Sequence, residues 1–232
     1  MKTDTLDLRN MDCMELMAEF PDNHFDLAIV DPPYGIGADK AQNNSALSGR
    51  KSNGGAWKEY KDTSWDESPP EDEYFGELAR VSKGRIVWGG NYFPIQDSGV
   101  IVWNKGENGT LPHGEMAKAS MQTFKVFNMS RCDAYINGTG EKIHPTQKPV
   151  ALYKWLLQNY AKPGQRILDT HMGSGSIAIA CHYFGCHLTA SELDTDYFEA
   201  ACNRIQRETR QADMFSGEVF QEQSAKQEEM TL

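Results

Sequence analysis

A carboxylate, two prolines and an aromatic ring stand in a row directly after an apolar run at residues 25–30. The row is Asp31-Pro32-Pro33-Tyr34. Because consecutive prolines fix two φ angles and donate no backbone hydrogen bond, the chain leaves the run extended and holds the carboxylate, a free carbonyl and the ring rigidly. Such a group suits a flat heterocycle that carries an amine, since the ring stacks and the oxygens accept from the amino group. The plainer alternative is a strand followed by a proline-rich turn.

A glycine-rich bend between a predicted strand and a predicted helix is the second group of residues that could bind a ligand. It is Asp169-Thr170-His171-Met172-Gly173-Ser174-Gly175-Ser176. Glycines let a backbone approach a ligand closely, and a helix amino terminus favours a carboxylate or phosphate. Glu192 follows about 20 residues later, where dinucleotide folds carry an acid that accepts hydrogen bonds from ribose hydroxyls. These features together predict a nucleoside site.

The same bend leaves a second interpretation open. Gly173, Gly175 and Ala178 satisfy G-x-G-x-x-A, the permissive fingerprint of nicotinamide enzymes. An oxidoreductase, however, leaves the Asp31–Tyr34 segment without a role.

A polar segment before an amphipathic run forms the third group, His144-Pro145-Thr146-Gln147-Lys148-Pro149. Pro149 suits the first position of the helix that the run predicts. The histidine, threonine and lysine can reach a carboxylate near that helix start. The alternative is a polar turn with a helix cap.

The elements that must position these groups alternate between strands and helices. Strands are predicted at 25–31, 85–88, 100–103, 166–169 and 187–190, and helices at 12–20, 70–82, 149–161, 174–183 and 194–211. This alternation predicts an α/β fold with a doubly wound, mostly parallel sheet covered on both faces. Such folds bind ligands at the carboxyl ends of their strands, where the first two groups stand. Residues 104–142 are predicted to be irregular, with one strand-like patch at 124–127.

The composition restricts the class of protein. The 232 residues suit one domain, and their five cysteines show no C-x-x-C spacing, so neither a disulfide framework nor a metal site is expected. We find no membrane-spanning run and no signal peptide, so a cytoplasmic protein is expected. The net charge of −10 argues against nucleic acid, but residues 39–61 carry five basic side chains against two acidic ones. That stretch is either a phosphate-contacting loop or a solvated one.

The three groups, in this order, resemble the β-group DNA amino-methyltransferases, the adenine-N(6)/cytosine-N(4) family that uses S-adenosylmethionine. The Asp31–Tyr34 segment resembles the catalytic motif of that family, and the other two groups resemble its cofactor-side motifs. Glu192 matches the ribose-binding acid, and Asp12 and Cys13 resemble the segment that touches the cofactor's adenine. The resemblance covers most of residues 10–205.

The resemblance implies a Rossmann-like, circularly permuted methyltransferase domain over residues 1–211. It also implies a small inserted target-recognition segment at 104–142. The composition of two other stretches predicts a mobile basic loop at 35–65 and a disordered polar tail at 212–232. The implied catalytic residues are Asp31, Pro32, Pro33 and Tyr34. The implied cofactor-binding residues are Asp12, Cys13, Asp31, His144, Thr146, Lys148, Asp169, Gly173, Ser174, Gly175, Ser176 and Glu192. Candidate DNA contacts are Arg50, Lys51, Lys58, Lys125 and Arg131, for which phosphate contact or plain solvation is the alternative.

The implied activity is methyl transfer from S-adenosylmethionine to the exocyclic amino group of adenine in duplex DNA. The base flips out, Tyr34 stacks on it, and Asp31 and the carbonyl of Pro32 accept its amino hydrogens. Phe93 and Trp57 are assigned to the core and to the loop rather than to the base. A cytosine-amino enzyme and a catalytically silent DNA-binding relative remain alternatives. A cognate restriction nuclease as partner, and a monomeric or homodimeric state, are left open.

Overall fold

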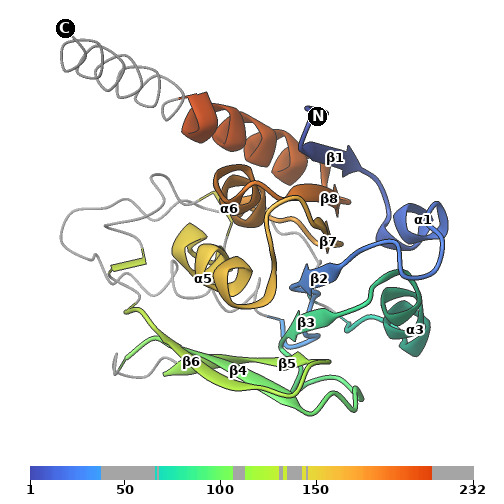
Figure 1. Ribbon diagram of the computed structural model, residues 1–232, viewed down its shortest axis with the longest axis vertical. Helices are drawn as coiled ribbons and strands as arrows, with labels where there is room; N and C mark the ends of the chain where they lie inside the picture. Colours follow the sequence, from blue (N-terminus) through green and yellow to red (C-terminus); the bar gives the residue numbers. More distant parts are fainter. Residues whose placement is uncertain are drawn as a thin grey trace, which may run out of the picture.

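The computed structural model describes residues 1–37, 66, 68–106, 113–130, 133–134, 143–144 and 146–210. Within these ranges the strands form one eight-stranded sheet in the order β1-β8-β7-β2-β3-β5-β4-β6 (Figure 1). The strands are β1 (Leu6–Asn10), β2 (Leu27–Val30), β3 (Arg85–Trp88), β4 (Gly99–Asn104), β5 (Gly114–Ala119), β6 (Phe124–Asn128), β7 (Arg166–Asp169) and β8 (His187–Glu192). Every pairing is parallel except those of β5 with β3 and β4, which confirms the predicted α/β class and mostly parallel sheet.

Helices cover both faces of the sheet, as predicted. One face carries α5 (Val150–Tyr160), α6 (Ser176–Phe184) and the helix 195–210, and the other carries α1 (Cys13–Ala18) and α3 (Asp72–Val81) (Figure 1). Strand β2 explains the arrangement, because its residues are buried on both sides. Its Leu27 and Ile29 join the core under α5 and α6, whereas Ala28 and Val30 join the core under α1 and α3. A run of apolar residues without alternation is typical of such a doubly covered parallel strand.

The helix ends agree with the sequence prediction to within about two residues. Asp12 caps α1 through hydrogen bonds from the backbone N–H groups of Met14 and Glu15. Pro149 was predicted as the first residue of α5, but its ψ of 144° is extended, so it is the N-cap and the helix begins at Val150.

The structure corrects two points of the sequence prediction. Strand β1 was not predicted, although Leu6 and Leu8 alternate with half-buried neighbours at the sheet edge. Residues 104–142 were predicted to be irregular apart from a strand-like patch at 124–127. That patch is β6, whereas β5 was not predicted, and both strands belong to the main sheet. Strand β5 contains no β-branched or aromatic residue, and its buried side chains are Ala117 and Ala119, so its composition gives no strand signal.

The sheet order places the carboxyl ends of β8, β7 and β2 next to one another. Ala28 of β2 is in register with Leu168 of β7, and Asp169 of β7 with Ala190 of β8. Both pairs are parallel, so the residues that follow these three strands emerge at one edge. That edge carries Asp31, the bend after Asp169, and Glu192.

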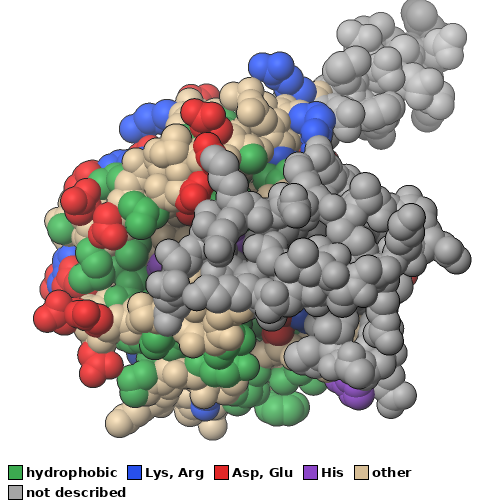
Figure 2. All heavy atoms as spheres, turned by 180° about the vertical axis from the view of Figure 1, so that it is seen from behind, with side chains coloured by type: hydrophobic (Ala, Val, Ile, Leu, Met, Phe, Trp, Pro, Cys, Tyr) green, Lys and Arg blue, Asp and Glu red, His purple; other side chains and the backbone are tan. Residues whose placement is uncertain are grey.

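Acidic side chains gather on the side of the molecule where α1 and α3 lie, seen from behind in Figure 2. Helix α3 and its cap contribute Glu71, Asp72, Glu73 and Glu77. Within the described ranges, no helix is both long and apolar enough to cross a membrane.

Candidate active site

The Asp31–Tyr34 segment leaves β2 in an extended path and folds back on its own carboxylate. The Tyr34 hydroxyl donates a hydrogen bond to Asp31 Oδ1 at 2.7 Å, and Lys148 Nζ donates to Asp31 Oδ2. Asp66 Oδ1 accepts from the backbone N–H of Tyr34 at 2.6 Å and of Gly35 at 2.9 Å. The two prolines have no N–H to donate, so Tyr34 and Gly35 carry the first backbone N–H groups after them, and the Asp66 carboxylate binds both. The carboxylate and the ring are therefore held side by side.

Buried charges extend from Asp31 into the sheet. The ammonium of Lys148, whose side chain is 3% exposed, lies between Asp31 and Glu115, with 3.3 Å from its Nζ to Glu115 Oε2. Lys105, at the end of β4, pairs with the same Glu115. Burial by itself would lower the pKa of Lys148, but the charges of Asp31 and Glu115 more than offset it and raise that pKa. Lys148 is thus a fixed cation behind the Asp31 carboxylate.

The sequence predicted that Lys148 can reach a carboxylate near the start of the following helix and that it binds the cofactor. The structure pairs Lys148 with the carboxylate of Asp31, and the cofactor contact stays a prediction. Burial, together with the charge of Asp31, raises the pKa of Tyr34 well above its usual value. Tyr34 therefore stays neutral and can donate a hydrogen bond at any pH near 7.

The glycine bend after β7 is tied to the end of β8. The N–H of Gly173 donates to Glu192 Oε2 at 2.9 Å, and the N–H of Asp194 donates to Glu192 Oε1 at 3.1 Å. Gly175 has a φ of 72°, and a Cβ there would lie 2.7 Å from Ile205 Cδ1, so glycine suits both the backbone and the packing. Each carboxylate oxygen of Glu192 accepts one of these hydrogen bonds, and a carboxylate has about four acceptor sites in all, so it can also accept from a ligand hydroxyl.

The two serines of the bend are buried and have protein partners. Ser174 Oγ lies 3.2 Å from Ser176 Oγ, and the guanidinium of Arg204 donates to Ser176 Oγ at 3.0 Å and to the carbonyl of Ser174 at 2.8 Å. Burial lowers the pKa of Arg204 to about 10. The hydroxyls thus join the bend to the helix 195–210.

Asp169 and His171 carry strongly shifted pKa values. Burial raises the pKa of Asp169 to about 8, although its Oδ1 accepts a hydrogen bond from the N–H of His171. Burial lowers the pKa of His171 to about 4, so the imidazole is neutral near pH 7. Its Nδ1 lies 2.9 Å from the Thr170 hydroxyl, which in turn contacts the hydroxyl of Tyr74 at 2.6 Å.

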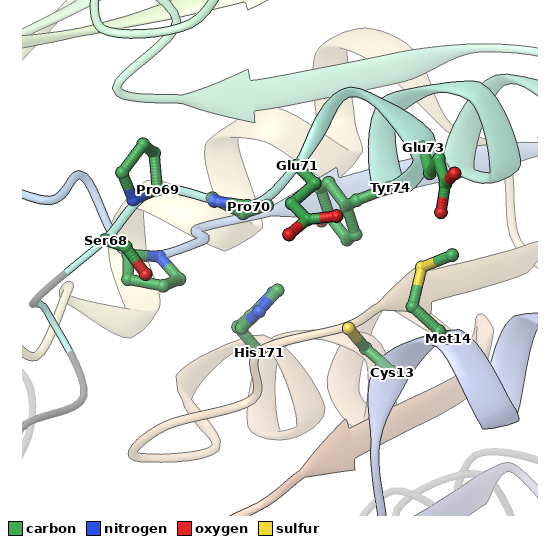
Figure 3. Close-up of a pocket in the computed structure, with 10 residues that line it drawn as sticks. Cys13, Met14, Ser68, Pro69, Pro70, Glu71, Glu73, Tyr74 and His171 are labelled. Atoms are coloured by element: carbon green, nitrogen blue, oxygen red, sulfur yellow. The ribbon is translucent and has the colours of Figure 1, made fainter.

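A cavity of about 370 Å³ opens beside these residues (Figure 3). Cys13 and Met14 reach it from α1 and His171 from the bend after β7, facing the stretch that leads into α3. It is lined by Cys13, Met14, Pro33, Ser68, Pro69, Pro70, Glu71, Glu73, Tyr74 and His171. Pro33 belongs to the Asp31–Tyr34 segment, so the segment that carries the Asp31 carboxylate also contributes to the wall of the cavity.

The remaining predicted residues divide into three groups. Cys13 lines the cavity, Asp12 caps α1, and the ring of His144 packs edge-on against Tyr197 with its Nδ1 3.2 Å from the Thr146 hydroxyl. Lys125 lies on β6 and bonds to Asn159 of α5, apart from this cluster. The predicted contacts and segments outside the described residues are Arg50, Lys51, Lys58, Arg131, nearly all of the loop 35–65 and the tail 212–232.

Several site residues escaped the sequence analysis. Tyr74 and Glu71 line the cavity, but tyrosine and glutamate at the start of a helix look like ordinary surface residues. Lys105 and Glu115 lie in the segment that was predicted as irregular. No local pattern indicates that they pair, because Lys105 follows β4, Glu115 lies on β5, and the partner Lys148 is more than 30 residues away in sequence.

Comparison with known proteins gives a consistent result. Residues 116–203 match the family model described as DNA methylase, N6_N4_Mtase. YubD of Escherichia coli (strain K12), a methylase by name, is 24% identical over 84% of this chain and 87% of its own length. The type II methyltransferase M.HpaI of Haemophilus parainfluenzae is 33% identical over 29% of this chain and 21% of its own length.

Solved structures share the fold. The PvuII DNA methyltransferase, described as cytosine-N4-specific, has a TM-score of 0.60 at 12% identity, over 90% of this chain and 92% of that one. The M1.HpyAVI–SAM complex has a TM-score of 0.53 at 17% identity, over 86% of this chain and 99% of that one. Residues 116–203 thus resemble the N6/N4 DNA amino-methyltransferase family by the matched model, and the solved structures show that the chain shares their fold.

Proposed function

We propose that this chain transfers a methyl group from S-adenosylmethionine to the exocyclic amino group of adenine in duplex DNA. One observation carries the proposal: the Asp31 carboxylate and the Tyr34 ring are hydrogen-bonded to each other, and the segment that carries them contributes a residue to the lining of a nucleoside-sized cavity. Pro33 lines that cavity and lies between the two residues that would hold the base. Two flat groups can therefore be bound next to each other at the carboxyl ends of β2 and β7.

The cavity fits the cofactor by the chemistry of its lining. Pro33, Tyr74 and the thioether of Met14 offer apolar contact to an adenine ring, and the Glu71 and Ser68 side chains offer polar edges. Glu192 would accept from ribose hydroxyls through its free lone pairs, and the bend at Gly173 would pass along the rest of the cofactor. When bound, S-adenosylmethionine supplies a methyl group on a positively charged sulfur that leaves as a neutral thioether.

Asp31 orients the amino group of the target base. A carboxylate offers about four acceptor sites, so Asp31 can accept an amino hydrogen while it keeps the Lys148 contact. The carbonyl of Pro32 accepts the second amino hydrogen, which draws the nitrogen lone pair out of conjugation with the ring. After transfer the nitrogen carries a surplus proton, and the Asp31 carboxylate is the adjacent base. Orientation and fixed charge are the main contributions of the protein.

A base inside a duplex is out of reach of such a recessed site, so we infer that the target is flipped out. Asp31 favours adenine, as the resemblance to adenine enzymes implies, although a cytosine amino group presents the same hydrogens. The acidic side at α1 and α3 repels phosphates, so the duplex approaches elsewhere (Figure 2). We assign target recognition to residues 104–142 with the basic residues of the loop 35–65.

A methyl-transfer assay tests the proposal. Purified chain is incubated with unmethylated genomic DNA and tritiated S-adenosylmethionine, and the DNA is then digested for mass spectrometry of its nucleosides. We expect N6-methyladenine with the wild-type chain and none with Asp31→Asn, a substitution of nearly equal size. If the modified nucleoside is N4-methylcytosine instead, the target base is cytosine and not adenine. A folded wild-type chain that binds S-adenosylmethionine but labels no DNA would support the silent relative and refute the proposal.

A further inference from the structure

Tyr92 covers the ring of Tyr34, the ring that the proposed function uses to hold a flipped base. The two ring centroids are 5.2 Å apart and the planes differ by 17°, which is a stacked pair. Tyr92 is 49% exposed, so it lies between Tyr34 and the solvent. Its neighbour Phe93 is 7% exposed and meets Tyr34 edge-on at 6.0 Å, as part of the core.

The turn after β3 is built to deliver Tyr92 to this place. Gly89 has a φ of 68° and accepts the N–H of Tyr92 at 2.8 Å through its carbonyl. A Cβ on Gly89 would lie 2.2 Å from the Tyr34 ring, and a Cβ on Gly90 would lie 2.4 Å from the Lys118 side chain. Both positions thus exclude larger residues, and the backbone runs directly along Tyr34 before Tyr92 turns back over the ring.

A base and Tyr92 cannot share this face of Tyr34 in the observed arrangement. A ring inserted between two others needs about 7 Å between the outer planes, twice the contact distance of carbon atoms. The separation of 5.2 Å leaves no such space. Tyr92 can leave, because within the described residues its hydroxyl makes no hydrogen bond and half of its side chain is in solvent.

We propose that Tyr92 occupies the target-base position and is exchanged for the flipped base. This inference rests on the proposed function and adds a specificity element to it. Tyr92 keeps the Tyr34 ring from binding any flat group that stacks less well than a phenol. A purine presents a larger π surface than a pyrimidine, so it displaces Tyr92 more readily, and the exchange favours adenine over cytosine.

A fluorescence titration with 2-aminopurine 2′-deoxyriboside tests the exchange. Stacking on Tyr34 quenches this nucleoside, and saturating S-adenosylhomocysteine keeps it out of the cofactor cavity. We compare the wild-type chain with Tyr92→Ala, which removes the competitor, and with Tyr92→Phe, which retains the stacked ring. We expect Tyr92→Ala to bind about 3- to 14-fold more tightly than wild type, from the ordinary strength of an aromatic pair. Tyr92→Phe should match wild type, and Tyr34→Ala should abolish quenching.

A second measurement uses the intact ring. With 3-fluorotyrosine incorporated, the ¹⁹F resonance of Tyr92, assigned through Tyr92→Phe, should move toward the free amino acid's position when the nucleoside is added. A Tyr92→Ala chain that binds as wild type or more weakly overturns the proposal, and weaker binding would make Tyr92 a second wall of the base site. Absence of quenching by every variant also overturns it. Methyl transfer to DNA by wild type then shows separately whether the proposed function stands.

Discussion

Replacing Glu115 by glutamine removes the central negative charge from the buried series Lys105, Glu115, Lys148 and Asp31. The substitution changes the volume of the side chain very little, so the effect is electrostatic. Lys148 keeps Asp31 as a partner, but Lys105 loses the carboxylate with which it pairs. Removing the charge of one partner in a buried ion pair typically costs about 3–5 kcal/mol.

The loss of folding stability can also be derived from the pKa of Glu115. Burial by itself would raise this pKa, but the charges of Lys148 and Lys105 lower it from 4.5 to about 2. A shift of this size corresponds to about 3 kcal/mol of stability at pH 7. Because the folded pKa lies below the unfolded one, the contribution is complete above about pH 5 and is lost as the pH falls toward about 2.

We therefore expect Glu115→Gln to lower the free energy of unfolding by about 3 kcal/mol at pH 7 and by only about 2 kcal/mol at pH 3.5. Urea denaturation followed by tryptophan fluorescence at several pH values between these limits measures the difference. Glu77→Gln is the matched control, because Glu77 pairs with Arg80 on the exposed surface of α3 and should change stability little. A loss that is independent of pH, or no larger than that of the control, would refute the reasoning.

Three further substitutions test the site. Asp31→Ala should abolish methyl transfer while the affinity for S-adenosylhomocysteine, measured by calorimetry, stays within a few fold; residual turnover with lost cofactor binding would contradict the assignment. Glu192→Ala should weaken that affinity roughly 10- to 150-fold, from about 1.5–3 kcal/mol for hydrogen bonds to a charged group, and an unchanged Kd would remove its ribose role. Gly89→Ala should lower the unfolding temperature more than Gly37→Ala does, since both have positive φ but only the Gly89 Cβ meets Tyr34; equal shifts would argue against that contact.

Local sequence determined much of the architecture. Apolar runs, glycine bends and capping residues lie within a few positions of one another, so periodicity and turn chemistry predict most of the helices and strands. The carboxyl ends of parallel strands meet at one edge of a sheet. The sequence therefore predicts that Asp31, the bend after Asp169 and Glu192 lie at the same edge, and the strand pairing agrees. The failures are β1, a short edge strand, and β5, which has no β-branched or aromatic residue to indicate a strand.

Tertiary structure alone decided which side chains meet across these elements. Lys148 reaches Asp31 from 117 positions along the chain, Glu115 joins it from a strand between β3 and β4, and Tyr92 covers Tyr34 from a separate turn. Tyr74 and His171 line one cavity from different elements. Short-range sequence patterns predict the backbone conformation near each residue. These contacts instead depend on the order of the strands and on how the helices pack against the sheet. The sequence by itself thus determined which chemical groups stand at the edge, and the packing of distant segments decided their partners, charges and access.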